Sequence, residues 1–515
     1  MTQDAGQVGV YPFRRGHSER PFSEAPWSIG QYTGFSDPAD TNTRLRDLLR
    51  HDNQSIGIAL DLPTQLGLNP DHPHARGEVG RVGVSIASVD DLEALLADIP
   101  LDSVQSISTT ANSIGPMMLG LFLALSRRRG VDPSSFVLRL QNDVLKEHAA
   151  RGTQIFAVEH GVKLTIDVIE YCAANIPTWT PICISGYHMR DAGGTRAQEL
   201  GFTLANTREY LRRSAERGVS VSDLAPTISW FLSAGVEVLH EAAKMRAARE
   251  LWATMLHDEF GVRTDKALKV HLSTYTLGGE LSPYEITNNA VRVGLAALGA
   301  VLGGVQRLTC SAIDEAIGLP TSETALLSIR TQQIILQETS VGDVVDPLGG
   351  SVFVEGLTTA LVDEARLIAQ SVEERGGALN AIASGWVREQ IDESAWQSQL
   401  ERSATPRVGE AGATADDVDA PSANLTAHYE SERRERFVEW KARRQRGPLD
   451  AAVSRLDEGV RSNQNLVDLM ADVFEADGTI GEVVDVLVGH YELAPERQMR
   501  RAIGPSSHLA PVATT

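Results

Sequence analysis

The chain has 515 residues, of which 42% are hydrophobic, and it carries a formal net charge of −21 at pH 7. This length exceeds one ordinary core, so we expect one large domain with an appendage. The acidic balance disfavours a nucleic acid or an anionic membrane as partner, because both bind basic surfaces.

Residues 1–50 are predicted to form an N-terminal arm, rich in Arg, Pro and Ser. They lack the apolar core of a signal peptide, and no apolar run approaches the roughly 20 residues that span a bilayer. We therefore expect a soluble, cytoplasmic protein without a membrane partner. Cys172, Cys183 and Cys310 show no CxxC spacing, which predicts neither disulfides nor a zinc cluster.

Residues 51–400 are predicted to form the catalytic domain, in which short apolar strands alternate with helices. The strands are expected at 55–61, 104–110, 136–141, 181–187, 226–231, 268–273 and 304–309, with a weaker one near 342–346. The helices are expected at 90–98, 114–129, 160–175, 206–216, 235–257 and 285–301. Eight such units predict an α/β fold, the (β/α)8 TIM barrel, with function at the C-terminal ends of the strands. A doubly wound open sheet is the alternative.

The character of the sequence changes after the barrel. Residues 401–423 contain few large apolar side chains and are predicted to be a linker. Residues 424–502 return to apolar stripes at helical spacing and are predicted to be a helical extension that packs as core. Residues 503–515 are predicted to be a disordered tail.

The strand at 136–141 alternates between an apolar and a polar face. Phe136, Leu138 and Leu140 share the apolar face, while Arg139 and Gln141 share the other. If the apolar face packs against helices, the arginine must point inward, where it is costly without an anionic partner. The strand therefore predicts one wall of an anion-binding active site.

Six motifs together resemble the catalytic subunit of the methylmalonyl-CoA mutase family. They are GEVGRVGV at 77–84, QNDVLKE at 141–147, ISGYHMRDAG at 184–193, DEAIGLPT at 314–321, RTQQIILQE at 330–338 and DPLGGS at 346–351. The likeness runs from Tyr11 to Gly377. It implies an isomerase in which a TIM barrel encloses an acyl thioester, such as an acyl-CoA, and is capped by adenosylcobalamin. It also makes the strand at 136–141 the third of the barrel.

The family binds cobalamin on a Rossmann-like domain that carries an Asp-x-His-x-x-Gly motif, and this spacing does not occur in the chain. The resemblance therefore implies a large subunit without a cobalamin-binding domain. We expect a separate small cobalamin-binding subunit to hold most of the adenosylcobalamin. A hetero-oligomer, built on a dimeric large subunit and served by a chaperone GTPase, would follow.

The resemblance also assigns roles to individual residues. His188 matches the donor to the thioester carbonyl, Tyr32 the tyrosine over the reaction centre, and Tyr187 a barrel-lining residue. Arg151 matches the arginine that pairs with the free carboxylate of methylmalonyl or succinyl groups, which a bidentate guanidinium suits well.

Further positions are expected to complete the site. Gln141 is expected to support the carbonyl, His271 and Gln306 to line the substrate pocket, and Glu315 and Gln65 to contact the cofactor. No metal ligands are expected in this chain.

The chain departs from the family pattern at several positions. Ala25, Gly30 and Thr227 stand where relatives have arginines, and Arg139 stands where they have a small hydroxyl residue. The family's His-x-Gln-Thr and His-Thr-Asn become His271-Leu272-Ser273-Thr274 and Thr309-Cys310-Ser311. Several arginines that relatives use to bind the phosphates of coenzyme A are thus missing, while the inward face of the barrel gains one cation, Arg139.

This exchange suggests a substrate with an extra anionic or polar group near Arg139, or one that is not a coenzyme A thioester. The alternative is that a barrel carboxylate such as Asp61 neutralises Arg139, while the coenzyme A phosphates use other basic residues, for example Arg14, Arg15 or Arg20.

Two other function classes remain open. A metal-dependent aldolase or hydrolase would have to gather Asp61, His188 and His271 as ligands, although no HxH spacing supports it. A non-catalytic scaffold that binds a cobalamin protein would have no need to retain Tyr32 and Arg151.

Overall fold

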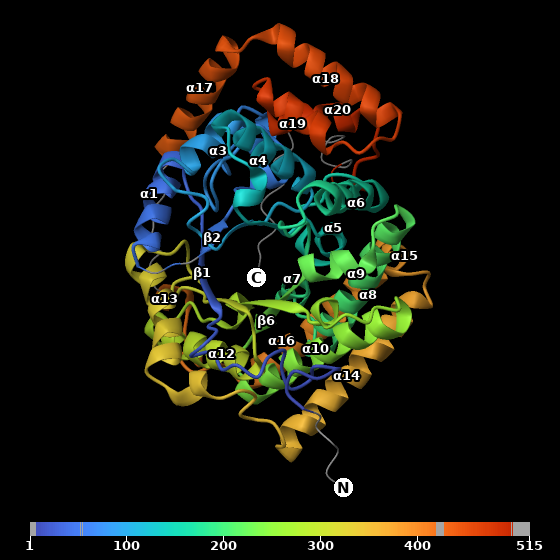
Figure 1. Ribbon diagram of the computed structural model, residues 1–515. Coiled ribbons are helices and arrows are strands. Elements are labelled where there is room, and N and C mark those ends of the chain that lie inside the picture. The colour runs from blue at the N-terminus through green and yellow to red at the C-terminus, as the bar shows by residue number, and fades with distance from the viewer. Residues whose placement is uncertain (1–6, 52, 54, 419–426, 496, 498–515) are drawn as a thin grey trace.

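The computed structural model describes residues 7–51, 53, 55–418, 427–495 and 497. Eight parallel strands form its centre: β1 (Ser28–Thr33), β2 (Ser55–Ile58), β3 (Ser106–Thr109), β4 (Leu138–Leu140), β5 (Cys183–Ser185), β6 (Ser229–Ala234), β7 (His271–Thr276) and β8 (Arg307–Thr309). Their order, β4-β3-β2-β1-β8-β7-β6-β5, runs around a ring. The helices surround this ring, as Figure 1 shows.

The ring closes between β4 and β5, the two ends of the strand order. Arg139 and Thr180 form a parallel bridge there, and the Leu140 amide donates to the Thr180 carbonyl at 3.0 Å. The Cys183 amide donates to the Gln141 carbonyl at 3.0 Å. This nearly closed ring confirms the predicted (β/α)8 TIM barrel and excludes the open doubly wound sheet.

The first strand of the barrel lies inside the predicted arm. β1 pairs with both β2 and β8, whereas the strand predicted near 342–346 is wrong, because Ser340–Asp343 forms the 3-10 helix η7. Gly30 and Gln31 give β1 a low strand propensity. Pairing with β2 on one side and β8 on the other stabilises the strand in spite of this. The strand that carries Arg139 is consequently the fourth of the barrel, not the third.

Helices fill the spaces between strands and form the outer layer. Those of the barrel are α1 (Pro38–Leu49), α2 (Leu62–Gln65), α3 (Val89–Leu95), α4 (Gly115–Arg129), α5 (Val144–Lys146), α6 (Val158–Asn175), α7 (Tyr187–Asp191), α8 (Arg196–Glu216), α9 (Val221–Leu224), α10 (Val238–Glu259), α11 (Asp265–Leu268), α12 (Asn289–Gly303) and α13 (Ser322–Gln337). They are followed by α14 (Val352–Glu373), α15 (Ala378–Ala383) and α16 (Trp386–Ala404). The last four are α17 (Ala427–Arg443), α18 (Arg446–Arg461), α19 (Val467–Glu475) and α20 (Ile480–Val488).

Helix α12 and the 3-10 turn before it form a long apolar segment of the described chain. The 18 residues Ile286–Gly303 are long and apolar enough to cross a bilayer by length and composition alone, more than the sequence reading allowed for. In the fold, α12 packs against α10, and its Val293, Ala296 and Ala300 are buried in the main core. The barrel layer thus buries part of this segment, while Val291 and Leu295 remain exposed.

The C-terminal helices α17–α20 lie against the same side of the barrel as α3 and α4, at the top of Figure 1. Helix α19 packs along α4, and Phe474 lies over Gly120, where an added Cβ would be 3.1 Å from the ring. Leu456 and Met470 belong to one apolar cluster with the α4 residue Phe122. The predicted tail at 503–515 lies outside the described residues.

The N-terminal segment is tied to the opposite edge of the barrel. Phe13 is buried, and the fully buried Arg249 donates from Nε to the Phe13 carbonyl at 3.0 Å. Arg14 pairs with Glu250 and Arg15 with Asp346, both at 2.6 Å. Both arginines therefore serve to fasten this segment.

Phe474→Ala tests whether the C-terminal helices belong to the barrel core. Removing this buried ring opens a cavity against α4, so we expect the free energy of unfolding to fall by about 3–5 kcal/mol. Urea denaturation measures the change. Phe353→Ala is the matched control, because that ring is 55% exposed, and its effect should stay within about 0.5 kcal/mol. Equal effects of the two substitutions would show that the helices add little to the core.

Candidate active site

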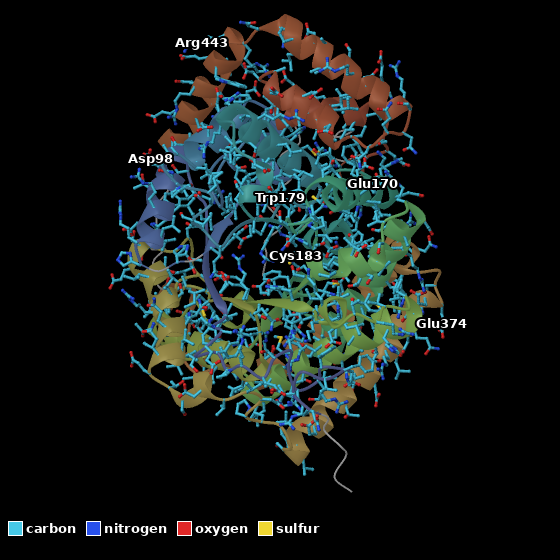
Figure 2. All side chains as sticks on the ribbon, in the orientation of Figure 1. Asp98, Glu170, Trp179, Cys183, Glu374 and Arg443 are labelled. Atoms are coloured by element: carbon cyan, nitrogen blue, oxygen red, sulfur yellow. The ribbon has the colours of Figure 1, made fainter. Side chains whose placement is uncertain are left out.

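A cavity of about 290 Å³ occupies the barrel interior toward the C-terminal ends of the strands. Many inward-facing positions hold small residues instead of the branched aliphatic side chains that usually fill a TIM barrel. These are Gly57, Ser108, Cys183, Ser229, Ser273 and Thr309. Figure 2 shows Cys183 at the centre of the molecule. The barrel is therefore hollow and has space for a ligand.

Most of the site residues expected from the sequence meet in this cavity. Those that line it are Tyr32, Arg139, Gln141, Arg151, Tyr187, His188 and Glu315. They come from β1, β4 and the turn after it, the π-helix Glu147–Arg151, α7, and the loop after β8. Their convergence from segments almost 300 positions apart is the geometric result that sequence spacing could not supply.

Three expected residues do not line the cavity. His271 begins β7 on the same inward face as Ser273, but it lies further toward the N-terminal end. Gln306 lies in a second cavity beside Trp27, and both ends of its amide bind backbone, at Leu272 N and Gly304 O. Gln65 ends α2 and donates to the Leu60 carbonyl at 2.6 Å.

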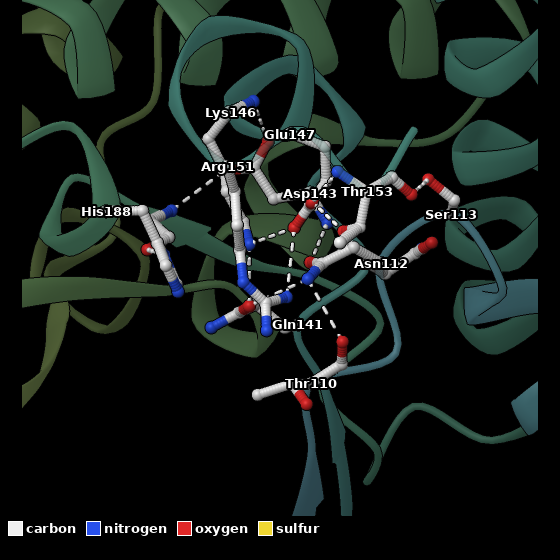
Figure 3. A network of polar contacts seen from close by, with 12 residues as sticks. Thr110, Asn112, Ser113, Gln141, Asp143, Lys146, Glu147, Arg151, Thr153 and His188 are labelled. Carbon is white, nitrogen blue, oxygen red and sulfur yellow. Dashed lines mark hydrogen bonds and ion pairs between the residues drawn. The ribbon is translucent and has the colours of Figure 1, made fainter. Parts of the chain in front are cut away.

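Two donors hold the Gln141 side chain in one orientation. Its Oε1 accepts from Lys146 Nζ at 2.9 Å and from Asn112 Nδ2 at 3.0 Å. Figure 3 shows this network at the end of β4. Since both bonds occupy the oxygen, the amide nitrogen remains as a donor to the cavity.

Arg151 is held by a short π-helix, η3 (Glu147–Arg151), directly after α5. A π-turn widens the helix by one residue and is frequent at functional sites. Glu147 pairs with both Lys146 and Arg151, the latter at 3.4 Å, and these cations hold the pKa of its carboxyl at about 2 against the opposing effect of burial. Burial lowers the pKa of Lys146 to about 8. Arg151 keeps part of its guanidinium open to the cavity, with the side chain 24% exposed.

Asp143 connects the ends of β4 and β5. Its carboxylate accepts from Tyr210 Oη and from the Ser185 amide, each at 2.8 Å, and it caps α5. Burial raises its pKa to about 6. Asp143 thereby fixes the loops that carry Gln141 and His188 relative to each other.

His188 lies in the first turn of α7, with one ring nitrogen engaged. Nδ1 is 2.8 Å from Ser185 Oγ, and burial together with the cations of Lys146 and Arg151 lowers the imidazole pKa well below its usual value. The ring is therefore neutral near pH 7. Its Nε2 edge is left for the cavity, where the ring also contacts Tyr187 and Phe231.

Aromatic rings form the remaining walls. Tyr187 stacks on Phe231 with ring centroids 5.2 Å apart, and Tyr32 Oη is 2.8 Å from Thr110 Oγ1. Burial raises the pKa of both tyrosines, so both stay neutral. The aromatic rings thus give the cavity an apolar wall beside its polar groups, a combination that is common in small-molecule sites.

Glu315 lies at the rim and is the cavity's carboxyl group. Its Oε2 accepts from Tyr275 Oη at 2.8 Å, and burial raises its pKa to about 7. An added Cβ at Gly278 would be 2.6 Å from Oε1, so the bare backbone there leaves the carboxyl group room. Part of the Glu315 population is protonated near neutral pH and can donate a hydrogen bond.

The sequence reading missed Arg307, Phe231 and Tyr275, which all line the cavity. The signal for Arg307 was present, because β8 alternates and only one of two neighbours faces inward. Gln306 was expected inward, whereas Arg307 and Thr309 take that face. The register of the strand is shifted by one residue from the one expected.

Asp61 does not neutralise Arg139, so the expected pairing of these two residues is wrong. Its carboxylate caps α2, accepting from the Thr64 and Gly80 amides at 2.9 and 2.8 Å. Within the described ranges, no group of three or more His, Cys, Asp or Glu residues could hold a metal ion. The gathering of Asp61, His188 and His271 that an aldolase or hydrolase would require is not observed.

Glu315→Gln tests the electrostatics of the rim. A carboxyl group whose folded pKa is raised from 4.5 to about 7 stabilises the fold below pH 4.5 and loses this contribution as the pH rises through 7. Relative to wild type, the variant should therefore gain stability between pH 4.5 and 7, by less than about 1.4 kcal/mol per pH unit. Urea unfolding across this range measures it. Glu364→Gln, at an exposed position of α14, should show no such trend.

Comparisons with known proteins agree with this geometry. The family model for methylmalonyl-CoA mutase matches residues 1–492. The chain is 35% identical to the 2-hydroxyisobutanoyl-CoA mutase large subunit of Aquincola tertiaricarbonis, covering 95% of this chain and 87% of that one. It is 36% identical to methylmalonyl-CoA mutase of Cereibacter sphaeroides (93% and 68% covered) and 34% identical to the human mitochondrial enzyme (93% and 64%). The chain belongs to the methylmalonyl-CoA mutase family of cobalamin-dependent acyl-CoA mutases, which are isomerases.

Proposed function

We propose that the chain is the catalytic subunit of an adenosylcobalamin-dependent mutase that rearranges a carboxylate-bearing acyl thioester of the methylmalonyl or succinyl kind. The convergence of Arg151, Gln141 and His188 at one end of the hollow barrel supports this proposal. A cation and two neutral donors match a substrate that has one carboxylate and one carbonyl oxygen.

Each group has a distinct task in this proposal. The Arg151 guanidinium, steadied by Glu147, holds the carboxylate in a bidentate pair. Gln141 donates through Nε2, because its oxygen is occupied. His188 donates through Nε2 to the thioester carbonyl when Ser185 donates to its Nδ1. Two fixed donors on one carbonyl stabilise negative charge that develops there during migration.

The aromatic walls keep the reacting groups apart from water. Tyr32, Tyr187 and Phe231 surround the donor groups, and a closed cavity prevents side reactions of unstable intermediates. Their rigid rings also restrict the movement of a bound acyl group, which favours one rearranged product.

The rim of the cavity fits a nucleoside-bearing cofactor. Glu315 lines the cavity beside Gly278, and outside the cavity lining the buried Gln65 Oε1 has no hydrogen-bond partner within the described residues. Both groups suit hydroxyl or amine donors. When bound, adenosylcobalamin supplies the radical chemistry that protein side chains lack.

The same proposal includes the partners. The relative from Aquincola is named a large subunit, which supports a separate small subunit that holds most of the cofactor. A cytoplasmic hetero-oligomer with a dimeric large subunit, matured by a chaperone GTPase, completes the proposal.

A second candidate is a mutase that acts on another acyl group or on a substrate without coenzyme A. The inward Arg139, which has no counterpart in the ordinary family pattern, favours it, as does the 2-hydroxyisobutanoyl-CoA mutase among the relatives. The two candidates share Gln141 and His188 and differ in the group that Arg151 holds.

Arg151→Met tests the primary proposal. We would combine the chain with candidate small cobalamin subunits and adenosylcobalamin, then assay methylmalonyl-, ethylmalonyl-, isobutyryl- and hydroxyisobutyryl-CoA and the corresponding free acids. Loss of one partner of a buried charge pair costs 2–5 kcal/mol, so kcat/KM for the carboxylate-bearing substrate should fall about a hundredfold. Arg50→Met, at the exposed residue that follows α1, is the control and should leave kcat/KM unchanged.

The substrate preference decides between the candidates. Turnover only of isobutyryl- or hydroxyisobutyryl-CoA would contradict a carboxylate-bearing substrate. No turnover of any of these compounds by an assembled, cofactor-loaded complex would favour the scaffold.

A further inference from the structure

The hollow barrel contains two arginines at a deeper level than the proposed reaction site. Arg139 extends from β4 and Arg307 from β8, which are four strands apart in both directions around the eight-stranded ring. Arg307 crosses the interior and donates to Ser106 and Ser108 of β3, each at 3.2 Å. Ser108 is the register partner of Arg139. The two guanidinium groups therefore converge from opposite walls.

Among the described residues, neither cation forms an ion pair with a carboxylate. The ionisable neighbours that affect the pKa of Arg307 are Arg139, which repels it, and the neutral Cys183 thiol, which also lies close to Arg139. Arg139 donates to Thr180 Oγ1 at 3.3 Å. Burial, followed by the repulsion of Arg139, lowers the pKa of Arg307 to about 10. Hydroxyl oxygens thus satisfy some of the N–H groups, but no carboxylate in the described part of the chain neutralises the charge.

The residues around the two arginines leave space for them but do not neutralise their charges. An added Cβ at Gly30 would be 3.0 Å from Arg307 Nη2, so glycine leaves space for the guanidinium. The buried His271 Nδ1 has no hydrogen-bond partner among the described residues, and burial and both arginines lower the pKa of this ring to about 3. It is a neutral polar group beside two unpaired cations.

Buried charges in proteins are normally paired, because desolvation of an isolated cation is costly. Arg307 is only 8% exposed, and the second like charge adds repulsion. Lys146 and Glu147 in the same barrel show that the fold pairs its buried charges elsewhere. A ligand that brings negative charge would neutralise both arginines and hydrogen-bond to their free N–H groups.

We infer that Arg139 and Arg307 form an oxyanion-binding subsite inside the barrel, which takes a second anionic group of the substrate, a carboxylate or a phosphate. Its place in catalysis depends on the proposed function, because the substrate would then carry one anion at Arg151 and another at this subsite. The acyl carbonyl would lie between them, within reach of Gln141 and His188. A carrier that extends down the barrel would pass between these two cations.

Inorganic phosphate and malonate are suitable probes, titrated by calorimetry into the full chain without cobalamin at constant ionic strength. We expect saturable binding that weakens at least about tenfold in Arg139→Met and Arg307→Met, since each charged hydrogen bond contributes about 1.5–3 kcal/mol. Arg151→Met should retain binding at the deeper subsite, and Arg50→Met should match wild type. The tighter of the two probes identifies the anionic group.

Thermal unfolding provides a second measurement. Saturating anion should raise the Tm of the wild type and leave the double variant unchanged. Without anion, the double variant should melt no lower than the wild type, because two unpaired buried charges have been removed. If Arg307→Met fails to fold, Arg307→Lys should fold and bind the anion with intermediate affinity, since lysine keeps the charge without the bidentate fork.

Three results would overturn the inference: no anion binding by wild type, equal binding by the double variant, or loss of binding in Arg151→Met alone. None of these readouts requires turnover. If the mutase assay fails but the anion binds, the proposed function is rejected and the subsite is kept. If the mutase is active but no anion binds, the subsite is rejected and the proposed function is kept.

Discussion

The volume of the inward-facing side chains determines what this barrel can do. Eight parallel strands ordinarily enclose layers of branched aliphatic residues, which leave no space for a ligand. Here Gly57, Ser108, Ser229 and Ser273 leave a cavity, and the apolar cores lie outside the ring, between strands and helices. Stability and function are thereby separated: the outer layers hold the fold, and the interior is free for polar groups.

The charged side chains inside the barrel form two different arrangements. At the C-terminal end, Lys146, Glu147 and Arg151 form a connected set, in which each ion has a partner and Gln141 takes its orientation from the lysine. Deeper in the barrel, the described residues give Arg139 and Arg307 hydroxyl groups as hydrogen-bond acceptors and no carboxylate as ion-pair partner. The first arrangement is complete in the protein alone and gives rigid donors. The second is incomplete and depends on a ligand for its neutrality.

Much of this could be predicted from the sequence. Strand alternation located Arg139 and Gln141 on an inward face, and family motifs indicated Tyr32, Arg151, Tyr187, His188 and Glu315, which the structure brings together. The predictions that failed concern features determined by strand pairing in the folded protein. The sequence did not predict β1, because glycine and glutamine make it a weak strand by composition. In β8 the inward face was expected one residue too early, at Gln306 instead of Arg307. The packing of α19 on α4 depends on contacts some 350 positions apart, which no local pattern encodes.

The closure between β4 and β5 has a mechanical consequence. Their joint consists of an isolated bridge and a few hydrogen bonds, where the other neighbours form regular ladders. Gln141 and Arg151 follow one strand of this seam, and His188 follows the other. A substrate bound by Gln141 and Arg151 on one side and His188 on the other would link β4 to β5. It would thus add contacts where the barrel has the fewest backbone hydrogen bonds between neighbouring strands.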